Sequence, residues 1–228
     1  MSETALNHAA FANRPHWVFD LDNTLYSATD TLFPQVDQRM KAFIMDLLGV
    51  DREEAHRVQK AYLTTYGLTM RGLMNEHDVD PQVFLDMVHD IDFESVTNDS
   101  DLDGLLERLQ GQKYIFTNAP GFHAHEVLAR LGISRHFDGI FDISAANYAP
   151  KPLKSAFNGM ISHFELDPTQ AVMVEDTSRN LKPAAQLGMA TLWVDTGCQW
   201  GRIDHDVSHV HAETPCVKQW LSDFLDAP

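Results

Sequence analysis

The chain has 228 residues, enough for one large domain or for a domain with a smaller insertion. Its 33 acidic residues outnumber its 17 lysines and arginines, for a net charge of −16, which excludes a broad basic surface for a nucleic acid polymer. The two cysteines form no disulfide framework, and no apolar run approaches the roughly 20 residues of a membrane span. We therefore expect a protein of the cytoplasm without a membrane partner, and the composition favours no particular oligomeric state. Residues 1–14 contain no apolar core of signal-peptide length and are expected to form a short mobile lead-in.

The first strong feature is WVFDLDNTLY, residues 17–26. Three bulky apolar residues predict a strand buried on both faces, and Asp20 and Asp22 come where that strand ends. Side chains two apart on a strand point the same way, so both carboxylates could enter one pocket before Asn23 and Thr24 turn the chain. Two acids so placed suit a divalent cation, or a nucleophile beside a proton donor. An isolated pair of this kind would equally fit a strand followed by an Asx turn.

A helical pattern without a convincing strand occupies residues 34 to 92. Apolar spacing, capping aspartates and terminating glycines indicate four helices. They are expected at 34–49, at 51–67, within 69–76, and from Asp80-Pro81 onward. The segment therefore predicts a small helical bundle inserted at residues 29–96.

From residue 97 onward, strands and helices alternate. Strands are expected at 113–116, 137–143, 172–174 and 190–194; helices at 102–109, 122–131, 157–164 and from Pro183 to Gly188; and a last edge strand and helix at 207–210 and 217–225. Such alternation predicts an α/β fold with a Rossmann-like parallel sheet flanked by helices. We expect residues 1–28 and 97–228 to form this core, with the all-helical segment inserted after the first strand.

Polar clusters come after the apolar runs at three further places. Thr117 and Asn118 end one strand, Lys151 lies in a proline-flanked loop, and Glu175 and Asp176 end another strand. Alone, each cluster fits a turn, a solvated lysine or a helix cap. Because parallel sheets bind ligands beyond the carboxyl ends of their strands, their joint occurrence in this order favours one site shared with the first two aspartates.

The four motifs DLDNTL, IFTN, the lysine of PKP and VEDTSRN resemble, in order and spacing, those of the haloacid dehalogenase superfamily. The resemblance covers essentially the whole core. It implies a Mg²⁺-dependent phosphatase that hydrolyses small phosphate monoesters through an aspartyl-phosphate intermediate.

The resemblance also implies roles for the motif residues. Asp20 would be the nucleophile and a metal ligand, and Asp176 another metal ligand. Asp22 would shuttle the proton and ligate the metal through its backbone carbonyl. Thr117 and Lys151 complete the catalytic set. The residues implied to bind phosphate are Asn23, Thr117, Asn118 and Lys151, and those implied to hold a metal-bound water are Glu175 and Asn180.

The inserted segment corresponds to the cap that closes over the active site in this superfamily. LYSATDTLFPQVDQRM, YGLTMRGL and VHDID resemble the pyrimidine 5′-nucleotidase branch, which implies UMP and CMP as substrates. Within the cap, Arg71 could read a base carbonyl or a second anionic group, and His77 could donate to a ribose or base oxygen. Alternatively, Arg71 pairs with an acid and His77 caps a helix.

Other readings compete with a nucleotidase. A phosphatase or phosphomutase acting on a sugar phosphate or another small metabolite would use the same residues. Haloacid dehalogenation itself is less favoured, because displacing halide from carbon needs neither Asp22 as a proton donor nor Mg²⁺; the intact motif set disfavours a non-catalytic binding protein. Two pairs of histidines, His123/His125 and His209/His211, are expected to be surface or packing residues.

Overall fold

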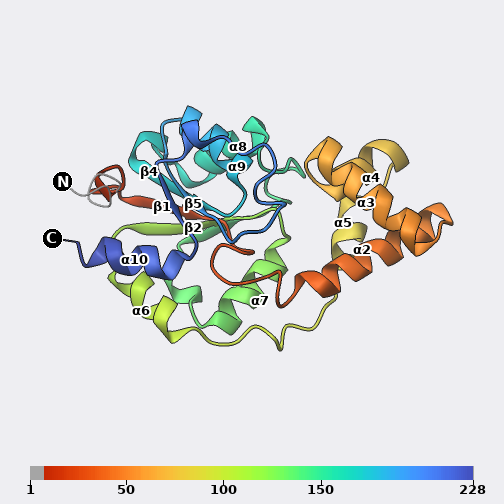
Figure 1. Cartoon of the computed structure of the whole chain (residues 1–228), viewed down its shortest axis with the longest axis horizontal. Helices are drawn as coiled ribbons and strands as arrows, with labels where there is room; N and C mark the ends of the chain where they lie inside the picture. Colours follow the sequence, from red (N-terminus) through yellow and green to blue (C-terminus); the bar gives the residue numbers. More distant parts are fainter. Residues whose placement is uncertain (1–7, 228) are drawn as a thin grey trace. The chain divides into compact units, whose positions relative to one another are not determined.

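The computed structural model describes residues 8–227, apart from the side chain of Val207. They form two compact units: Ala28–Val96 is one, and the residues before and after it together form the other. Figure 1 labels the elements of both. Within the described part of the chain, no helix combines the length and apolarity that crossing a membrane requires.

The larger unit is built on a six-stranded sheet in which every pairing is parallel, with the order β3-β2-β1-β4-β5-β6. The strands are β1 (His16–Phe19), β2 (Gln112–Phe116), β3 (Gly139–Phe141), β4 (Ala171–Glu175), β5 (Ala190–Val194) and β6 (Ala212–Thr214). All residues of β4 and β5 are buried, as expected for strands covered by helices on both faces. This confirms the predicted Rossmann-like α/β core.

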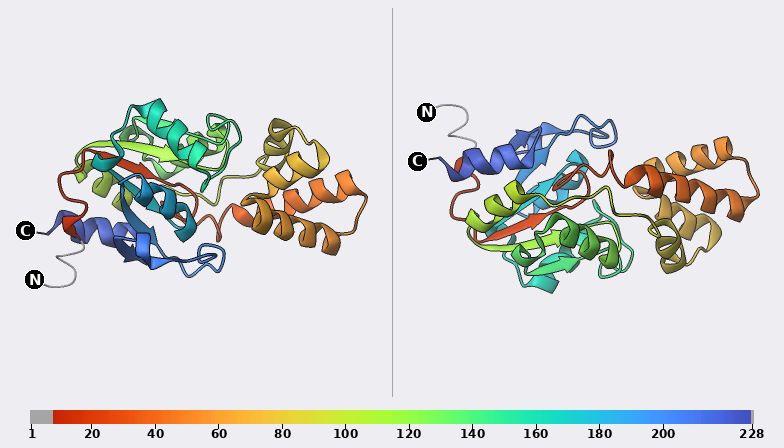
Figure 2. Two further views of the ribbon diagram at one scale, coloured as in Figure 1. Left: turned by 90° about the horizontal axis from the view of Figure 1, so that it is seen from above. Right: turned by 90° about the horizontal axis from the view of Figure 1, so that it is seen from below.

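Helices cover both faces of this sheet. They are α6 (Ser100–Arg108), α7 (Gly121–Leu131), α8 (Lys154–Phe164), α9 (Ser178–Gln186) and α10 (Val217–Leu225). Figures 1 and 2 show α8 and α9 on one face and α6, α7 and α10 on the other. Under α8 and α9, Val18 of β1 and Met173 of β4 join Phe157 and Leu181 in one buried cluster. The apolar strand residues thus form the core, and the strand ends are left for polar side chains.

The strand order places a topological switch at β1. The chain leaves β1 for β2 on one side and later returns through β4 on the other, with Phe19 paired to both Ile115 and Val174. At such a point the connections diverge, and a crevice opens beyond the carboxyl ends of the strands. Asp20, Thr117 and Asp176 come directly after the three strands that meet there.

The smaller unit consists of α2 (Phe33–Leu48), α3 (Arg52–Tyr66), α4 (Thr69–His77) and α5 (Pro81–Val88). The predicted start and stop signals are confirmed. Asp51 and Asp80 accept backbone N–H groups at the starts of α3 and α5, and Gly49 and Gly67 end α2 and α3 with φ of 64° and 80°. Here a left-handed residue is required, and glycine adopts it without a side-chain clash.

Three predictions about local structure are corrected. The last edge strand is Ala212–Thr214, whereas Val207–His209 forms a short 3-10 helix. The helix expected from Pro183 begins at Ser178 and contains that proline, because burial of Leu181 and Ala184 on the core outweighs the hydrogen bond that a proline removes.

The amino-terminal lead-in is the third correction. Residues 1–7 lie outside the described residues, but residues 8–14 are packed rather than mobile. Phe11 is fully buried and meets Trp220 edge-to-face with 4.8 Å between ring centroids. The Arg14 guanidinium donates to the carbonyl oxygens of Thr169 and Ala171 at 2.8 and 2.9 Å. A single aromatic anchor, invisible to helical or strand periodicity, explains the difference.

We predict that Gly72→Ala destabilises the protein by about 1–3 kcal/mol, because an added Cβ would lie 2.3 Å from Cγ of Tyr62 and push α4 away from α3. Gly104→Ala is the matched control: its Cβ meets nothing within 4 Å at an exposed position of α6, so it should stabilise by about 0.5–1 kcal/mol. Denaturant unfolding followed by circular dichroism measures both. Equal stability of the two variants would contradict the close α3–α4 contact.

Candidate active site

The loop after β1 positions the carboxylates of Asp20 and Asp22. The backbone N–H of Asp20 still donates to Val174 at 2.9 Å, so this residue continues the parallel ladder. The chain then turns tightly, with the N–H groups of Thr24 and Leu25 both donating to the Leu21 carbonyl. Asn23 sits in this turn with φ of 66°, a conformation that asparagine tolerates better than most residues. Asp20 is buried and Asp22 is half-buried.

Lys151 is the centre of the site. Its Nζ donates to Oδ1 of Asp20 at 2.6 Å, to Oε2 of Glu175 at 2.7 Å and to the Phe116 carbonyl at 2.8 Å. These bonds use all three donors of an ammonium group. Burial by itself lowers the pKa of Lys151, but the carboxylates of Asp20 and Glu175 outweigh it and raise that pKa above its ordinary value. The lysine is therefore a permanent buried cation.

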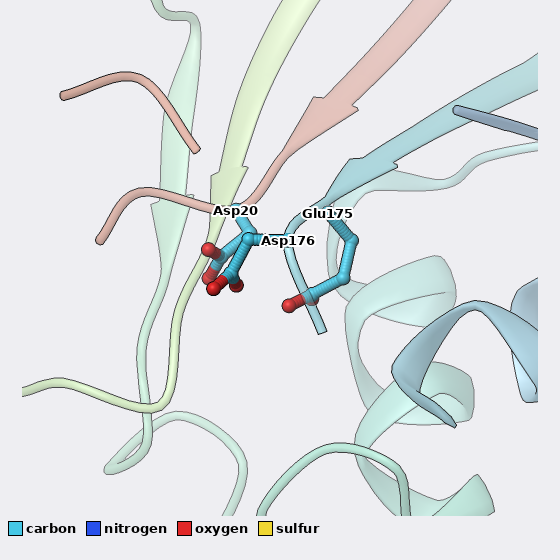
Figure 3. Close-up of side chains that lie close together, drawn as sticks. All are labelled: Asp20, Glu175 and Asp176. Atoms are coloured by element: carbon cyan, nitrogen blue, oxygen red, sulfur yellow. The ribbon is translucent and has the colours of Figure 1, made fainter. Parts of the chain in front are cut away.

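Three carboxylates surround this one cation. Oxygens of Asp20, Glu175 and Asp176 lie within 4.8 Å of one another, and Figure 3 shows them together at the strand ends. Burial, and then the charge of Glu175, raises the pKa of Asp20 to about 7. Burial, and then the charge of Asp20, also raises the pKa of Asp176. The site thus holds more negative charge than Lys151 neutralises.

A hard divalent cation fits this excess. Closely spaced carboxylate oxygens are the donors that Mg²⁺ prefers, and a cation among them would relieve the repulsion. Asn180 adds a second sign: its Nδ2 donates to Oε1 of Glu175 at 3.1 Å, while its buried Oδ1 has no hydrogen-bond partner among the described residues. An orphaned buried oxygen beside an acid suits a water of a hydrated cation. The predicted acids Asp20, Glu175 and Asp176 are therefore brought together.

Thr117 and Asn118, which follow β2, have different hydrogen-bond partners. Thr117 is buried, and its hydroxyl accepts the Ala119 N–H at 3.0 Å; in the described chain no acceptor takes the hydroxyl's own hydrogen. Oδ1 of Asn118 accepts the backbone N–H of Lys151 at 2.9 Å, and its Nδ2 donates to the Lys151 carbonyl at 3.4 Å. Asn118 thus fixes the loop that delivers Lys151, a task that the sequence did not reveal.

Asp22 has two donors on the same oxygen. Its Oδ1 accepts from the Tyr26 hydroxyl and lies 2.9 Å from Nε2 of His123. Burial, and then the Asp22 carboxylate, raise the pKa of Tyr26, so its phenol stays protonated and donates. The expectation that His123 is only a surface or packing residue is therefore incomplete: it is buried as a packing residue would be, but it also contacts a site carboxylate. Its position in the first turn after the IFTN motif was the available signal.

The other three histidines of the two pairs are surface or packing residues, as expected. His125 is exposed. His209 is buried and bonds to the Ser178 carbonyl at 3.1 Å, and His211 bonds to Thr191 through Nδ1.

The two cap residues singled out by sequence both lie on α4 of the smaller unit. Nε2 of His77 is 2.7 Å from the Tyr62 hydroxyl, and the helix is capped by Asp78 rather than by His77. The half-buried Arg71 side chain forms no ion pair with any acid of the described chain. Neither alternative offered for these residues is therefore seen, and their role in binding substrate stays a prediction.

The fold and the site together define an α/β enzyme core with carboxylates and a buried lysine at the carboxyl edge of a parallel sheet. The family model described as haloacid dehalogenase-like hydrolase matches residues 16–188, which is most of the chain. The chain belongs to this family of hydrolases, as the motif resemblance implied.

The chain is also similar to a named yeast protein. Phosphate metabolism protein 8 of Saccharomyces cerevisiae is 28% identical over 197 residues, covering 77% of this chain. The match spans only 60% of that relative's length.

Solved structures show the same fold at low identity. The HAD-hydrolase YfnB from Bacillus subtilis, bound to magnesium, has a TM-score of 0.60 and 14% identity, covering 94% of this chain and 100% of its own. The L-2-haloacid dehalogenase from Xanthobacter autotrophicus has a TM-score of 0.59 and 15% identity, and the match covers 94% of this chain and 99% of that one. A HAD phosphatase from Thermococcus onnurineus has a TM-score of 0.58 and 20% identity, and the match covers 91% of this chain and 94% of that one.

We predict that Mg²⁺ raises the thermal unfolding midpoint of the full chain, because a cation that binds only the native state stabilises it by about 2.7 kcal/mol at roughly a hundredfold excess over its Kd. Asp176→Asn should abolish the shift and be at least as stable as the wild type without metal, since one of the clustered charges is gone. Asp101→Asn, at an exposed position of α6, should keep the full shift. An equal shift in Asp176→Asn and wild type would contradict the site.

Proposed function

We propose that this chain is a Mg²⁺-dependent phosphatase that hydrolyses small phosphate monoesters through an aspartyl-phosphate on Asp20. The observation that carries the proposal is the bridge from Lys151 to Asp20 and Glu175, with Asp176 alongside. It supplies a fixed carboxylate nucleophile, a permanent cation and an acidic cluster for a metal. The family membership supports hydrolysis, and the name of the yeast relative refers to phosphate metabolism.

Asp20 is held as a nucleophile needs to be. Lys151 donates to its Oδ1, and the Thr24 hydroxyl donates to its Oδ2 at 2.9 Å. A carboxylate with both oxygens oriented does not have to reorganise before it attacks phosphorus. As the aspartyl oxygen bonds to phosphorus, the ester oxygen leaves with the electron pair of the broken bond and takes a proton from Asp22. A water then attacks the aspartyl-phosphate, gives its proton to Asp22, and releases inorganic phosphate and free Asp20.

The proposal assigns magnesium a defined set of ligands. Asp20, Asp176 and the backbone carbonyl of Asp22 would ligate it, with Glu175 and Asn180 holding its water. When bound, the cation neutralises charge on the nucleophile and on the phosphoryl oxygens. The magnesium-bound YfnB shares the fold, which supports the choice of metal.

The phosphoryl group is expected to meet donors from one strand end and two loops. Lys151 contributes charge, and Thr117 contributes a hydroxyl hydrogen. Asn23 contributes from the turn after β1. Asn118 acts mainly by fixing the backbone of Lys151.

Residues 1–28 and 97–228 are proposed as the catalytic core and residues 29–96 as the cap that selects the substrate. The cap motifs favour pyrimidine nucleoside 5′-monophosphates, UMP and CMP. Arg71, which has no ion-pair partner in the described chain, offers a cation for a base carbonyl, and the His77–Tyr62 pair offers a polar edge for a sugar or base oxygen.

We predict that UMP and CMP are hydrolysed faster than hexose phosphates, with Mg²⁺ required, and that 2-chloropropionate is not turned over. Phosphate release across this panel measures the preference. Asp20→Asn should lower kcat by about 10³-fold or more while leaving the unfolding midpoint near that of the wild type, because it removes the nucleophile and keeps the shape. Preference for hexose phosphates would refute the nucleotidase assignment; full activity of Asp20→Asn would refute the mechanism.

We predict that Arg71→Ala raises KM for UMP by about tenfold but changes KM for p-nitrophenyl phosphate little, because only the nucleotide carries a base to be read. Arg57→Ala is the matched control, since this exposed arginine of α3 already pairs with Glu54. Steady-state kinetics on both substrates measure the split. Equal effects of Arg71→Ala on both substrates would leave it a structural residue.

A further inference from the structure

The Asp22 carboxyl group is held from two directions, and the two donors differ in kind. Tyr26 belongs to the same tight loop and forms an isolated bridge with Asp22. His123 lies 101 positions away along the chain, on α7, with its Nε2 2.9 Å from Oδ1. The Asp22 side chain is 12% exposed, whereas that of His123 is 1% exposed. The histidine therefore meets Asp22 from the buried side.

We propose that His123 is a positioning residue that anchors Asp22 for proton transfer to the leaving group. The inference rests on the proposed phosphatase activity and adds a residue to it. Tyr26 belongs to the same loop as Asp22, so its hydrogen bond does not tie that loop to another element. The contact from His123 does, because α7 packs against β3 and buries Ala124 and Val127.

Two contacts on one oxygen also orient the carboxyl group. A carboxyl group that acts first as acid and then as base must present the same oxygen to the leaving group and later to water. Tyr26 and His123 are both directed at Oδ1, so they fix the orientation of the whole carboxyl group. The carboxyl group then gives its proton to the ester oxygen as the P–O bond breaks, and takes a proton from the attacking water.

A purely structural histidine is the competing explanation. His123 occupies the apolar face of α7, where leucine would fill the volume without needing a polar partner. Burial of an imidazole there costs free energy unless it is hydrogen-bonded, and its Nε2 is bonded to a site carboxylate. A structural role and a positioning role therefore predict different kinetics.

The test uses the full chain with Mg²⁺ and compares the single-turnover release of uridine from UMP with that of p-nitrophenolate from p-nitrophenyl phosphate. Uridine must be protonated as it leaves, and p-nitrophenolate need not be. His123→Leu should slow uridine release by about 100-fold, with KM little changed, and slow p-nitrophenolate release less than fivefold or so. His123→Gln, which keeps an N–H near the position of Nε2, should recover most of the uridine rate, while the shorter His123→Asn should not. His125→Leu, on the exposed side of α7, is the control.

Equal losses on both substrates, or no difference between the Gln and Asn variants, would overturn the positioning role while the phosphatase stands. The Gln and Asn pair decides the matter even if His123→Leu fails to fold. A wild-type chain that releases neither product would overturn the proposed function, and the inference with it.

Discussion

One buried ammonium group organises this protein. Nζ of Lys151 joins Asp20 after β1, the carbonyl of Phe116 in β2 and Glu175 at the end of β4, so the three strands that meet at the switch point share one cation. Burying a charge costs several kcal/mol unless it is paired and fully hydrogen-bonded, and here all three donors are used. Loss of this lysine would leave two buried carboxylates without compensation. Asn118, which binds the Lys151 backbone, extends the same constraint to the loop.

The site is nevertheless left with an excess of negative charge. Asp176 joins Asp20 and Glu175 around the single lysine, and burial, followed by the charge of Glu175, raises the pKa of Asp20 to about 7. This arrangement is unfavourable for folding alone, and it fits the proposed centre for a divalent cation and a phosphate. In that proposal, a bound cation would favour the ionised form of Asp20, and Lys151 would offset charge shared between the nucleophile and the phosphoryl group. The same charges of Lys151 and the three carboxylates thus affect both the stability of the fold and the reactivity of the site.

Sequence reasoning predicted the parallel core and the acid–lysine cluster because their signals are local. Apolar runs mark buried strands, and parallel strands bring the polar residues at their carboxyl ends to one edge of the sheet. It could not predict contacts made by geometry alone. His123 reaches Asp22 across 101 positions from a helix face that reads as apolar packing. Likewise, Phe11 anchors on Trp220, and α9 runs through Pro183, because tertiary burial outweighs local preference.

The central claim is that Asp20 becomes covalently phosphorylated. Trapping the chain during turnover with UMP and Mg²⁺, reducing it with borohydride and sequencing the peptides by mass spectrometry tests this directly, because borohydride converts an aspartyl-phosphate to homoserine while free aspartate survives. The account predicts homoserine at position 20 only when substrate is present, and none in Asp20→Asn. Turnover with aspartate intact at position 20, or homoserine at position 22 instead, would contradict it.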